Sequence, residues 1–137
     1  MESKPVDQPS FWKQRLELAI KQHHLHYSVY LASDELWERI YESHIQILRK
    51  EIKDTDSVLD IGCGYGRMAN LFSNYTGVDI SPDFIELARK TYTNKTFIQA
   101  DLRDLPFQNK QFDVGFMISV KGMIKNNLGS DAWQVME

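Results

Sequence analysis

Hydrophobic side chains recur along this chain with two different periods. In the first third they fall at helical spacing, with Ser10 placed to cap a helix over residues 10–27 and Ser33 placed to cap a longer helix over about 34–53. From residue 56 onward, short apolar runs alternate with turns and helical segments, the pattern of a parallel sheet with crossover helices. The predicted strands are residues 57–61, 75–80, 96–100 and 112–119.

Short segments of other character separate these strands. Residues 66–74 predict a short helix, and Ser81 caps a further helix that Pro82 opens at its first position. Residues 102–110 are too short and too interrupted by proline to form a long helix. Ser130 is placed to cap one more helix, which would begin close to the end of the chain.

Three regions follow from this change of period. Residues 1–9 are polar, contain two prolines, and are predicted to be a flexible N-terminus. Residues 10–55 are predicted to form an N-terminal helical cap, which packs on the same core because no linker-like insert separates it from residues 56–137. The fold class predicted for the chain is α/β, with flanking helices around a parallel sheet.

A glycine-rich turn follows the first predicted strand. Residues 58–66 read Val-Leu-Asp-Ile-Gly-Cys-Gly-Tyr-Gly, so a buried strand runs into glycines at alternating positions, and residues 62–66 are called the glycine loop below. Glycine permits positive φ and removes the Cβ atoms that would hold a ligand away from the backbone. By itself, such a turn also occurs as a tight connection in other α/β proteins. The loop therefore needs support from other positions.

Carboxylates at three successive strand ends supply that support. Asp60, Asp79 and Asp101 stand at or near the carboxyl ends of the first three strands, the edge where open α/β sheets bind ligands. Asp79 lies 17 positions after Gly62, where an acidic side chain can accept hydrogen bonds from both ribose hydroxyls. The glycine spacing differs from the dinucleotide fingerprint, and an aspartate just before the loop suits a cationic ligand better than a phosphate. An NAD-dependent dehydrogenase conflicts with this spacing.

Four ordered motifs carry a resemblance to a known family. They are residues 58–66, Gly-Val-Asp-Ile-Ser at 77–81, Ala-Asp-Leu at 100–102 followed by Leu-Pro-Phe at 105–107, and Phe-Asp-Val at 112–114. The chain resembles the class I S-adenosylmethionine-dependent methyltransferases of the small-molecule type. The resemblance implies a Rossmann-like fold of seven strands, of which this chain supplies the first four. We therefore expect either a C-terminally truncated product or a sheet completed by a partner chain.

The resemblance also implies roles for individual residues. The cofactor-binding residues expected are Asp60, Gly62, Cys63, Gly64, Asp79, Ile80, Asp101, Leu102 and Met117. The loop residues would lie near the methionine part of S-adenosylmethionine, Asp79 on the ribose hydroxyls, and Ile80 against the adenine. Asp101 and Leu102 would lie at the adenine edge, and Met117 near the amino end of the cofactor. A small side chain pointing into the sheet explains Cys63 better than a nucleophile does.

Neither a catalytic base nor a metal site is predicted. The family's histidine-rich stretch after the fourth strand is replaced by Lys-Gly-Met at 121–123, so no histidine is carried over as a base. His23, His24 and His26 resemble a metal cluster, but adjacent histidines on one helix point in different directions and no further ligand is evident. Surface or pocket lining is the interpretation preferred for them.

Composition and charge limit the partners and the cellular location that the sequence predicts. A net charge of -3 argues against a nucleic-acid partner, and no apolar run is long enough to span a membrane. The single cysteine fits a reducing compartment, so we expect a cytoplasmic protein. We expect a methyltransferase acting on an unidentified small-molecule acceptor. The alternative is a non-catalytic cofactor-binding module or subunit, with a homo-oligomer or partner chain covering the exposed fourth strand.

Overall fold

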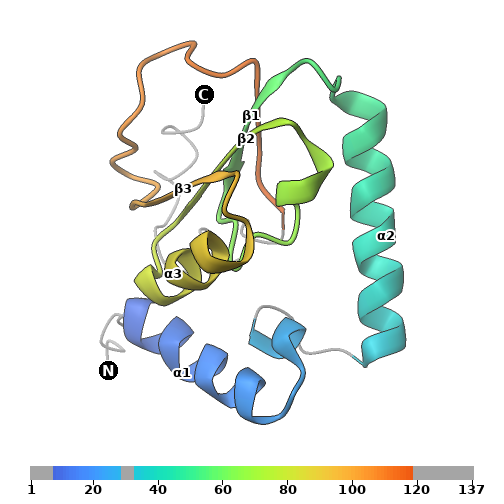
Figure 1. Ribbon diagram of the computed structural model, residues 1–137, viewed down its shortest axis with the longest axis vertical. Helices are drawn as coiled ribbons and strands as arrows, with labels where there is room; N and C mark the ends of the chain where they lie inside the picture. The colour runs from blue at the N-terminus through green and yellow to red at the C-terminus, as the bar shows by residue number, and fades with distance from the viewer. Residues whose placement is uncertain (1–7, 29–32, 119–137) are drawn as a thin grey trace, which may run out of the picture.

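The computed structural model describes residues 8–28 and 33–118, and it contains a sheet of four parallel strands (Figure 1). The strands are β1 (Ser57–Ile61), β2 (Asn74–Asp79), β3 (Thr96–Gln99) and β4 (Val114–Phe116), and their spatial order is β3-β2-β1-β4. The predicted parallel sheet is confirmed, and β1 has the predicted bounds. The fourth strand is shorter than predicted.

Two of the helices begin directly after the capping residues expected for them, Ser33 and Ser81, but the first helix begins before its expected cap. The helices are α1 (Gln8–Lys21), η1 (Leu25–Ser28), α2 (Asp34–Glu51), η2 (Ala69–Leu71) and α3 (Pro82–Thr91). The Ser33 side chain accepts a hydrogen bond from the Leu36 N–H, and the Ser81 side chain accepts one from the Phe84 N–H. These two caps are therefore confirmed, whereas the cap expected at Ser10 is wrong, because α1 begins at Gln8 and contains Ser10.

Two helix predictions were wrong. The first helix was expected to run to residue 27, yet α1 ends at Lys21 and His23 adopts φ 61°, a left-handed conformation that a continuing helix does not allow. The short helix expected over residues 66–74 is only the 3₁₀ turn η2. In both places, backbone geometry that the apolar pattern does not encode ended the helix.

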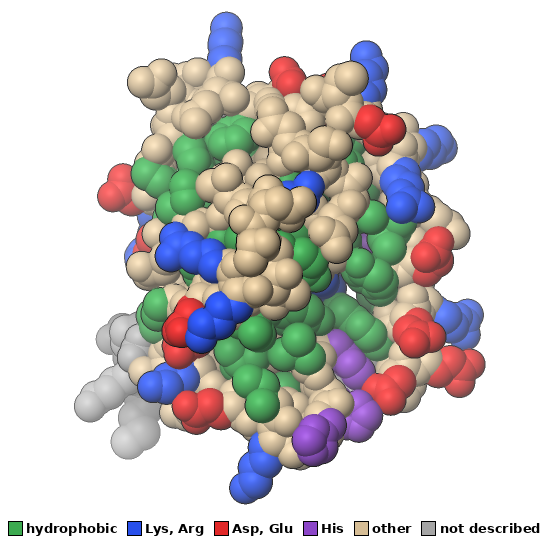
Figure 2. Space-filling view, viewed as in Figure 1, with side chains coloured by type: hydrophobic (Ala, Val, Ile, Leu, Met, Phe, Trp, Pro, Cys, Tyr) green, Lys and Arg blue, Asp and Glu red, His purple; other side chains and the backbone are tan. Residues whose placement is uncertain are grey.

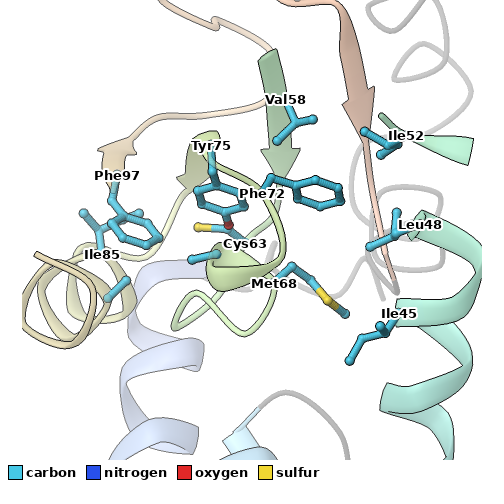
Figure 3. Close-up of a cluster of buried hydrophobic side chains, with 12 residues drawn as sticks. Ile45, Leu48, Ile52, Val58, Cys63, Met68, Phe72, Tyr75, Ile85 and Phe97 are labelled. Carbon is cyan, nitrogen blue, oxygen red and sulfur yellow. The ribbon is translucent and has the colours of Figure 1, made fainter. Parts of the chain in front are cut away.

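The main apolar cluster lies between the sheet and the helices α2 and α3. Val58 and Tyr75, which are partners in the register of β1 and β2, belong to this cluster with Phe97 of β3. Ile45 and Leu48 of α2, with Ile52 directly after it, reach the cluster from one side, and Ile85 of α3 reaches it from the other (Figure 3). Ala88 of α3 also belongs to the cluster. Side chains alternate along a strand, so Leu59 and Val78 point to the opposite face of the sheet.

The two N-terminal helices take different positions around this core. Helix α1 packs against α3, while α2 stands apart from both of them, and η1 lies between α1 and α2 (Figure 1). The predicted helix after Ser130 lies outside the described residues, as do residues 1–7. Within the described part of the chain, none of the helices combines the length and the apolar character needed to cross a membrane.

Candidate functional site

The glycine loop turns sharply because three of its residues have positive φ. Gly62, Gly64 and Gly66 have φ values of 74°, 57° and 87°. The backbone N–H groups of Gly62 and Cys63 both donate to the carbonyl oxygen of Val78, at 2.8 and 2.9 Å. Two hydrogen bonds therefore fix the start of the loop to the end of β2, as the glycine spacing predicted for a tight strand-to-helix turn.

Asp79 connects this loop to the helix that follows β2. One carboxylate oxygen accepts the Gly64 N–H at 2.9 Å, and the other accepts the Ser81 N–H at 2.9 Å. Burial raises the pKa of Asp79, and backbone N–H donors including those of Ser81 and Gly64 oppose the shift. The side chain thus joins the carboxyl ends of β1 and β2, next to the point between β1 and β4 where the strand order reverses.

Asp60 lies behind the loop in the apolar interior. It is 3% exposed, and one of its carboxylate oxygens accepts the Tyr75 hydroxyl at 2.6 Å. Burial raises the pKa of Asp60 to about 7, although the Tyr75 hydrogen bond and the charge of Arg67 act in the opposite direction. A carboxyl with this pKa exists in both protonation states near neutral pH, so a nearby cation would favour its ionised form.

The third carboxylate, Asp101, follows β3 at the same edge of the sheet. The Ala100 N–H donates to the Asp79 carbonyl oxygen at 3.0 Å, which holds the end of β3 against the end of β2. Asp101 is paired with Arg103 through Nε at 3.0 Å and Nη2 at 2.5 Å, and this hydrogen bonding lowers the pKa of Asp101. The sequence predicted Asp101 at this edge of the sheet but did not predict its pairing with Arg103.

The other predicted positions lie along the same edge. Ile80 follows β2 directly, and its carbonyl oxygen accepts the Gln99 side-chain amide at 3.2 Å. Leu102 is partly exposed after β3, and Met117 is partly exposed directly after β4. The carboxyl ends of parallel strands lie at one edge of a sheet, so the fold gathers all these positions there.

Cys63 is part of the packing beneath the loop. It is 3% exposed, and burial raises the pKa of its thiol well above the ordinary value. A Cβ on Gly77 would lie 2.9 Å from the Cys63 Sγ and 2.9 Å from the Tyr75 hydroxyl oxygen. The thiol therefore fills a tight space in the interior, and a protonated buried thiol is a poor nucleophile.

The comparison with family models decides the membership of this chain. The model described as a methyltransferase domain matches residues 59–130, which is more than half of the chain. The chain belongs to this methyltransferase family. The match begins in β1 and includes the glycine loop, Asp79, Asp101 and Met117.

The chain is also similar to individual proteins. An uncharacterized protein of Methanocaldococcus jannaschii is 44% identical over 82 residues, which cover 58% of this chain and 32% of that protein. A sterol 4-C-methyltransferase of Caenorhabditis elegans is 30% identical over 120 residues, covering 80% and 30% of the two chains. A crystal structure of a Pyrococcus horikoshii protein matches with a TM-score of 0.53 and 38% identity, covering 61% of this chain and 42% of that chain.

This methyltransferase chain therefore spans less than half the length of each of these relatives. The class I S-adenosylmethionine-dependent methyltransferase domain and its Rossmann-like fold, expected from the four motifs, are confirmed. Sequence reasoning had carried nine residues over as cofactor-binding positions. The fold brings their backbones to one edge, but contact with a cofactor stays a prediction.

Two side chains of the methyltransferase site were missed. Tyr75 reaches Asp60 because Asp60 pairs in register with Gly77, which has no side chain to block the approach. A glycine inside a strand often marks such a close approach, so Gly77 was the available signal. Arg67, just after the loop, is partly buried, and its guanidinium carbon lies 5.2 Å from the centre of the Trp37 ring.

The methyltransferase domain also has a pocket beside the glycine loop, which we call the histidine pocket. Its volume is about 370 Å³, and it is lined by His23, His24, Leu25, His26, Asp34, Trp37, Glu38 and Tyr65. Tyr65 belongs to the glycine loop and joins the pocket to it. Burial raises the pKa of Tyr65 to about 12, so its hydroxyl is protonated at neutral pH and does not act as a base there.

Proposed function

We propose that this chain carries the S-adenosylmethionine-binding part of an enzyme that methylates a small-molecule acceptor. The observation that carries the proposal is the position of Asp79, whose two carboxylate oxygens accept N–H groups from the glycine loop and from the start of α3. A carboxylate at the carboxyl end of β2, beside the glycine loop, is well placed for ribose hydroxyls. Family membership supports the choice of S-adenosylmethionine over a dinucleotide.

The nine predicted residues have distinct tasks in this proposal. Gly62 and Gly64 offer open backbone to the methionine part of the cofactor, with Asp60 behind them as a source of negative charge. Ile80 and Leu102 provide apolar surface for the adenine, and Asp101 accepts hydrogen bonds at its edge. Met117 lies near the amino end, and Cys63 shapes the loop from below. These residues position the reactants, and none of them transfers a proton.

The acceptor would enter from the side of Tyr65. When bound, S-adenosylmethionine supplies an electrophilic methyl group, and transfer depends chiefly on how closely and in what line the acceptor atom is held. The histidine pocket adjoins the loop and is large enough for part of a small molecule. The sterol named for the Caenorhabditis elegans relative is also a small molecule, which supports this acceptor class.

The first test is isothermal titration calorimetry of the full 137-residue chain with S-adenosylhomocysteine. Asp79→Asn keeps the shape of the side chain but removes its charge, and we expect its affinity to fall at least about tenfold. Asp113→Asn is the matched control, because Asp113 is an exposed carboxylate that accepts the Ser57 N–H at the opposite edge of the sheet. Its affinity should be unchanged.

Two results would contradict the proposal. One is a folded chain that does not bind S-adenosylhomocysteine, and the other is equal binding by the Asp79→Asn and Asp113→Asn chains. A chain that binds but methylates no acceptor would support the alternative, a cofactor-binding subunit that works with a partner. Among the described residues β4 pairs only with β1, which leaves its other edge available to such a partner.

A further inference from the structure

Two histidines and one aspartate from separate elements meet at the entrance of the histidine pocket. His24 and His26 lie in the turn between α1 and η1 and in η1 itself, and Asp34 is the first residue of α2. His24 Nδ1 is 3.1 Å from Asp34 Oδ1, and His26 Nε2 is 3.4 Å from the same oxygen. One possible ligand atom from each residue lies within 4.8 Å of the other two.

The two separations to Asp34 are compatible with atoms that share a metal ion. Zinc binds imidazole nitrogen at roughly 2.0–2.1 Å and carboxylate oxygen at roughly 2.0–2.2 Å, which places neighbouring ligands of a tetrahedral ion about 3.3 Å apart. The two measured separations to Asp34 lie on either side of that value. Only small side-chain movements would be needed to place an ion between the three atoms.

The surrounding residues hold the cluster in place and leave it accessible. His26 is 8% exposed, and its ring stacks on Trp37 with centres 5.2 Å apart and planes at 10°. The side chains of His24 and Asp34 are 39% and 61% exposed, so an ion can reach them from solvent. Histidine side chains gather at the lower edge of the face shown in Figure 2, beside acidic side chains.

We propose that His24, His26 and Asp34 bind a divalent transition-metal ion of the zinc or cobalt class. Two imidazoles and one carboxylate suit these ions, whereas magnesium and calcium prefer an all-oxygen set. Three protein ligands leave at least one position for water or for an oxygen of an acceptor in the pocket. The helix expected from the sequence would have separated the histidines, but the left-handed turn at His23 and the short η1 bring them to Asp34.

The direct test is titration of the full, tag-free chain with zinc chloride by isothermal titration calorimetry, with cobalt chloride absorption as a second readout. We expect one zinc ion per chain. Asp34→Asn should weaken binding at least about tenfold, because it removes the anionic ligand. Glu35→Gln is the matched control, since Glu35 is the next residue, is exposed, and belongs to the same first turn of α2. Its zinc affinity should be unchanged.

A second pair of variants separates the ligands from their neighbours. His24→Ala should weaken zinc binding at least about tenfold, whereas His23→Ala, which changes another histidine of the pocket, should not. Circular dichroism would show that both chains are folded. The proposal fails if the wild-type chain does not bind zinc, or if Asp34→Asn and His24→Ala bind it as the controls do. No cofactor is present in this experiment, so its outcome is independent of the proposed methyl transfer.

Discussion

The glycine loop and the histidine pocket share Tyr65 but are held together in different ways. The loop is held by backbone N–H groups that donate to Val78 and Asp79, and its last glycine, Gly66, packs closely against Phe97 and Tyr92. The pocket is built from side chains that stack and pair at a partly exposed surface. Substitutions in the loop should therefore cost stability, whereas substitutions in the pocket should chiefly change what it binds.

The largest effect that tests this contrast is expected from Gly66→Ala. Gly66 has φ 87°, and a Cβ there would lie 3.0 Å from ring atoms of Phe97 and Tyr92. Backbone strain and overpacking together should lower the free energy of unfolding by about 3 to 4 kcal/mol. Urea denaturation followed by circular dichroism measures this loss.

The matched control for Gly66→Ala is Gly115→Ala, a glycine substitution in strand β4. The nearest atom to a Cβ at Gly115 is the Leu59 carbonyl oxygen at 3.9 Å, an ordinary contact. We expect a change within about 0.5 kcal/mol for this exposed position. Equal stability of the two alanine variants would show that the loop is less constrained than its packing indicates.

The contrast also explains which features could be predicted from the sequence. The glycine loop and Asp79 belong to short motifs whose spacing along the chain determines their geometry, so both were identified. Asp60 was identified as well, but its partner Tyr75 was not, because that contact depends on the register between β1 and β2. Strand periodicity predicts that two strands are neighbours without specifying which residues face each other.

The histidine pocket could not be predicted from hydrophobic periodicity either, because it too depends on details of the backbone that the pattern does not specify. His24 and Asp34 meet only because α1 ends early and the backbone at His23 turns into the left-handed region. Positive φ is uncommon for any residue other than glycine, and nothing else in the apolar pattern ends the helix before residue 27. Hydrophobic periodicity does not predict contacts that depend on a single residue with an unusual backbone conformation.

The second prediction uses pH to probe the interior beneath the loop. The pKa of Asp60 is about 7 in the folded chain and roughly 3.9 in an unfolded one, so the folded state binds more protons between these values. Ionisation of Asp60 therefore lowers the free energy of unfolding increasingly as pH rises from about 4 to about 7, and this loss changes little above pH 7. Asp60→Asn removes this dependence.

The measurement is urea denaturation of wild-type and Asp60→Asn chains at pH 5 and pH 8. The stability of the variant relative to wild type should increase by about 2 to 3 kcal/mol between the two pH values. The two chains differ only at residue 60, so the contributions of all other side chains cancel in this difference. A relative stability that stays constant with pH would mean that the Asp60 carboxyl titrates in the ordinary acidic range.

The smallest predicted effect concerns a contact between the histidine pocket and Arg67, the residue that follows the glycine loop. Arg67 follows the glycine loop, and its guanidinium carbon lies 5.2 Å from the ring centre of Trp37, which lines the histidine pocket. A double-mutant cycle of Trp37→Leu and Arg67→Met should give a coupling free energy of about 0.5 to 1 kcal/mol. Urea denaturation of the four chains provides it.

A control double-mutant cycle uses Arg15 in place of Arg67 as the second mutated site. Arg15 stacks over Phe11 and Trp12 in α1. Trp37→Leu and Arg15→Met should be additive, because these two residues belong to different ring contacts. Coupling in the first cycle but not in the second would mean that occupation of the histidine pocket can influence the glycine loop through Arg67. Additivity in both cycles would mean that the two regions respond to their ligands independently, although they share Tyr65. In that case a metal ion in the pocket would act on an acceptor and not on the cofactor site.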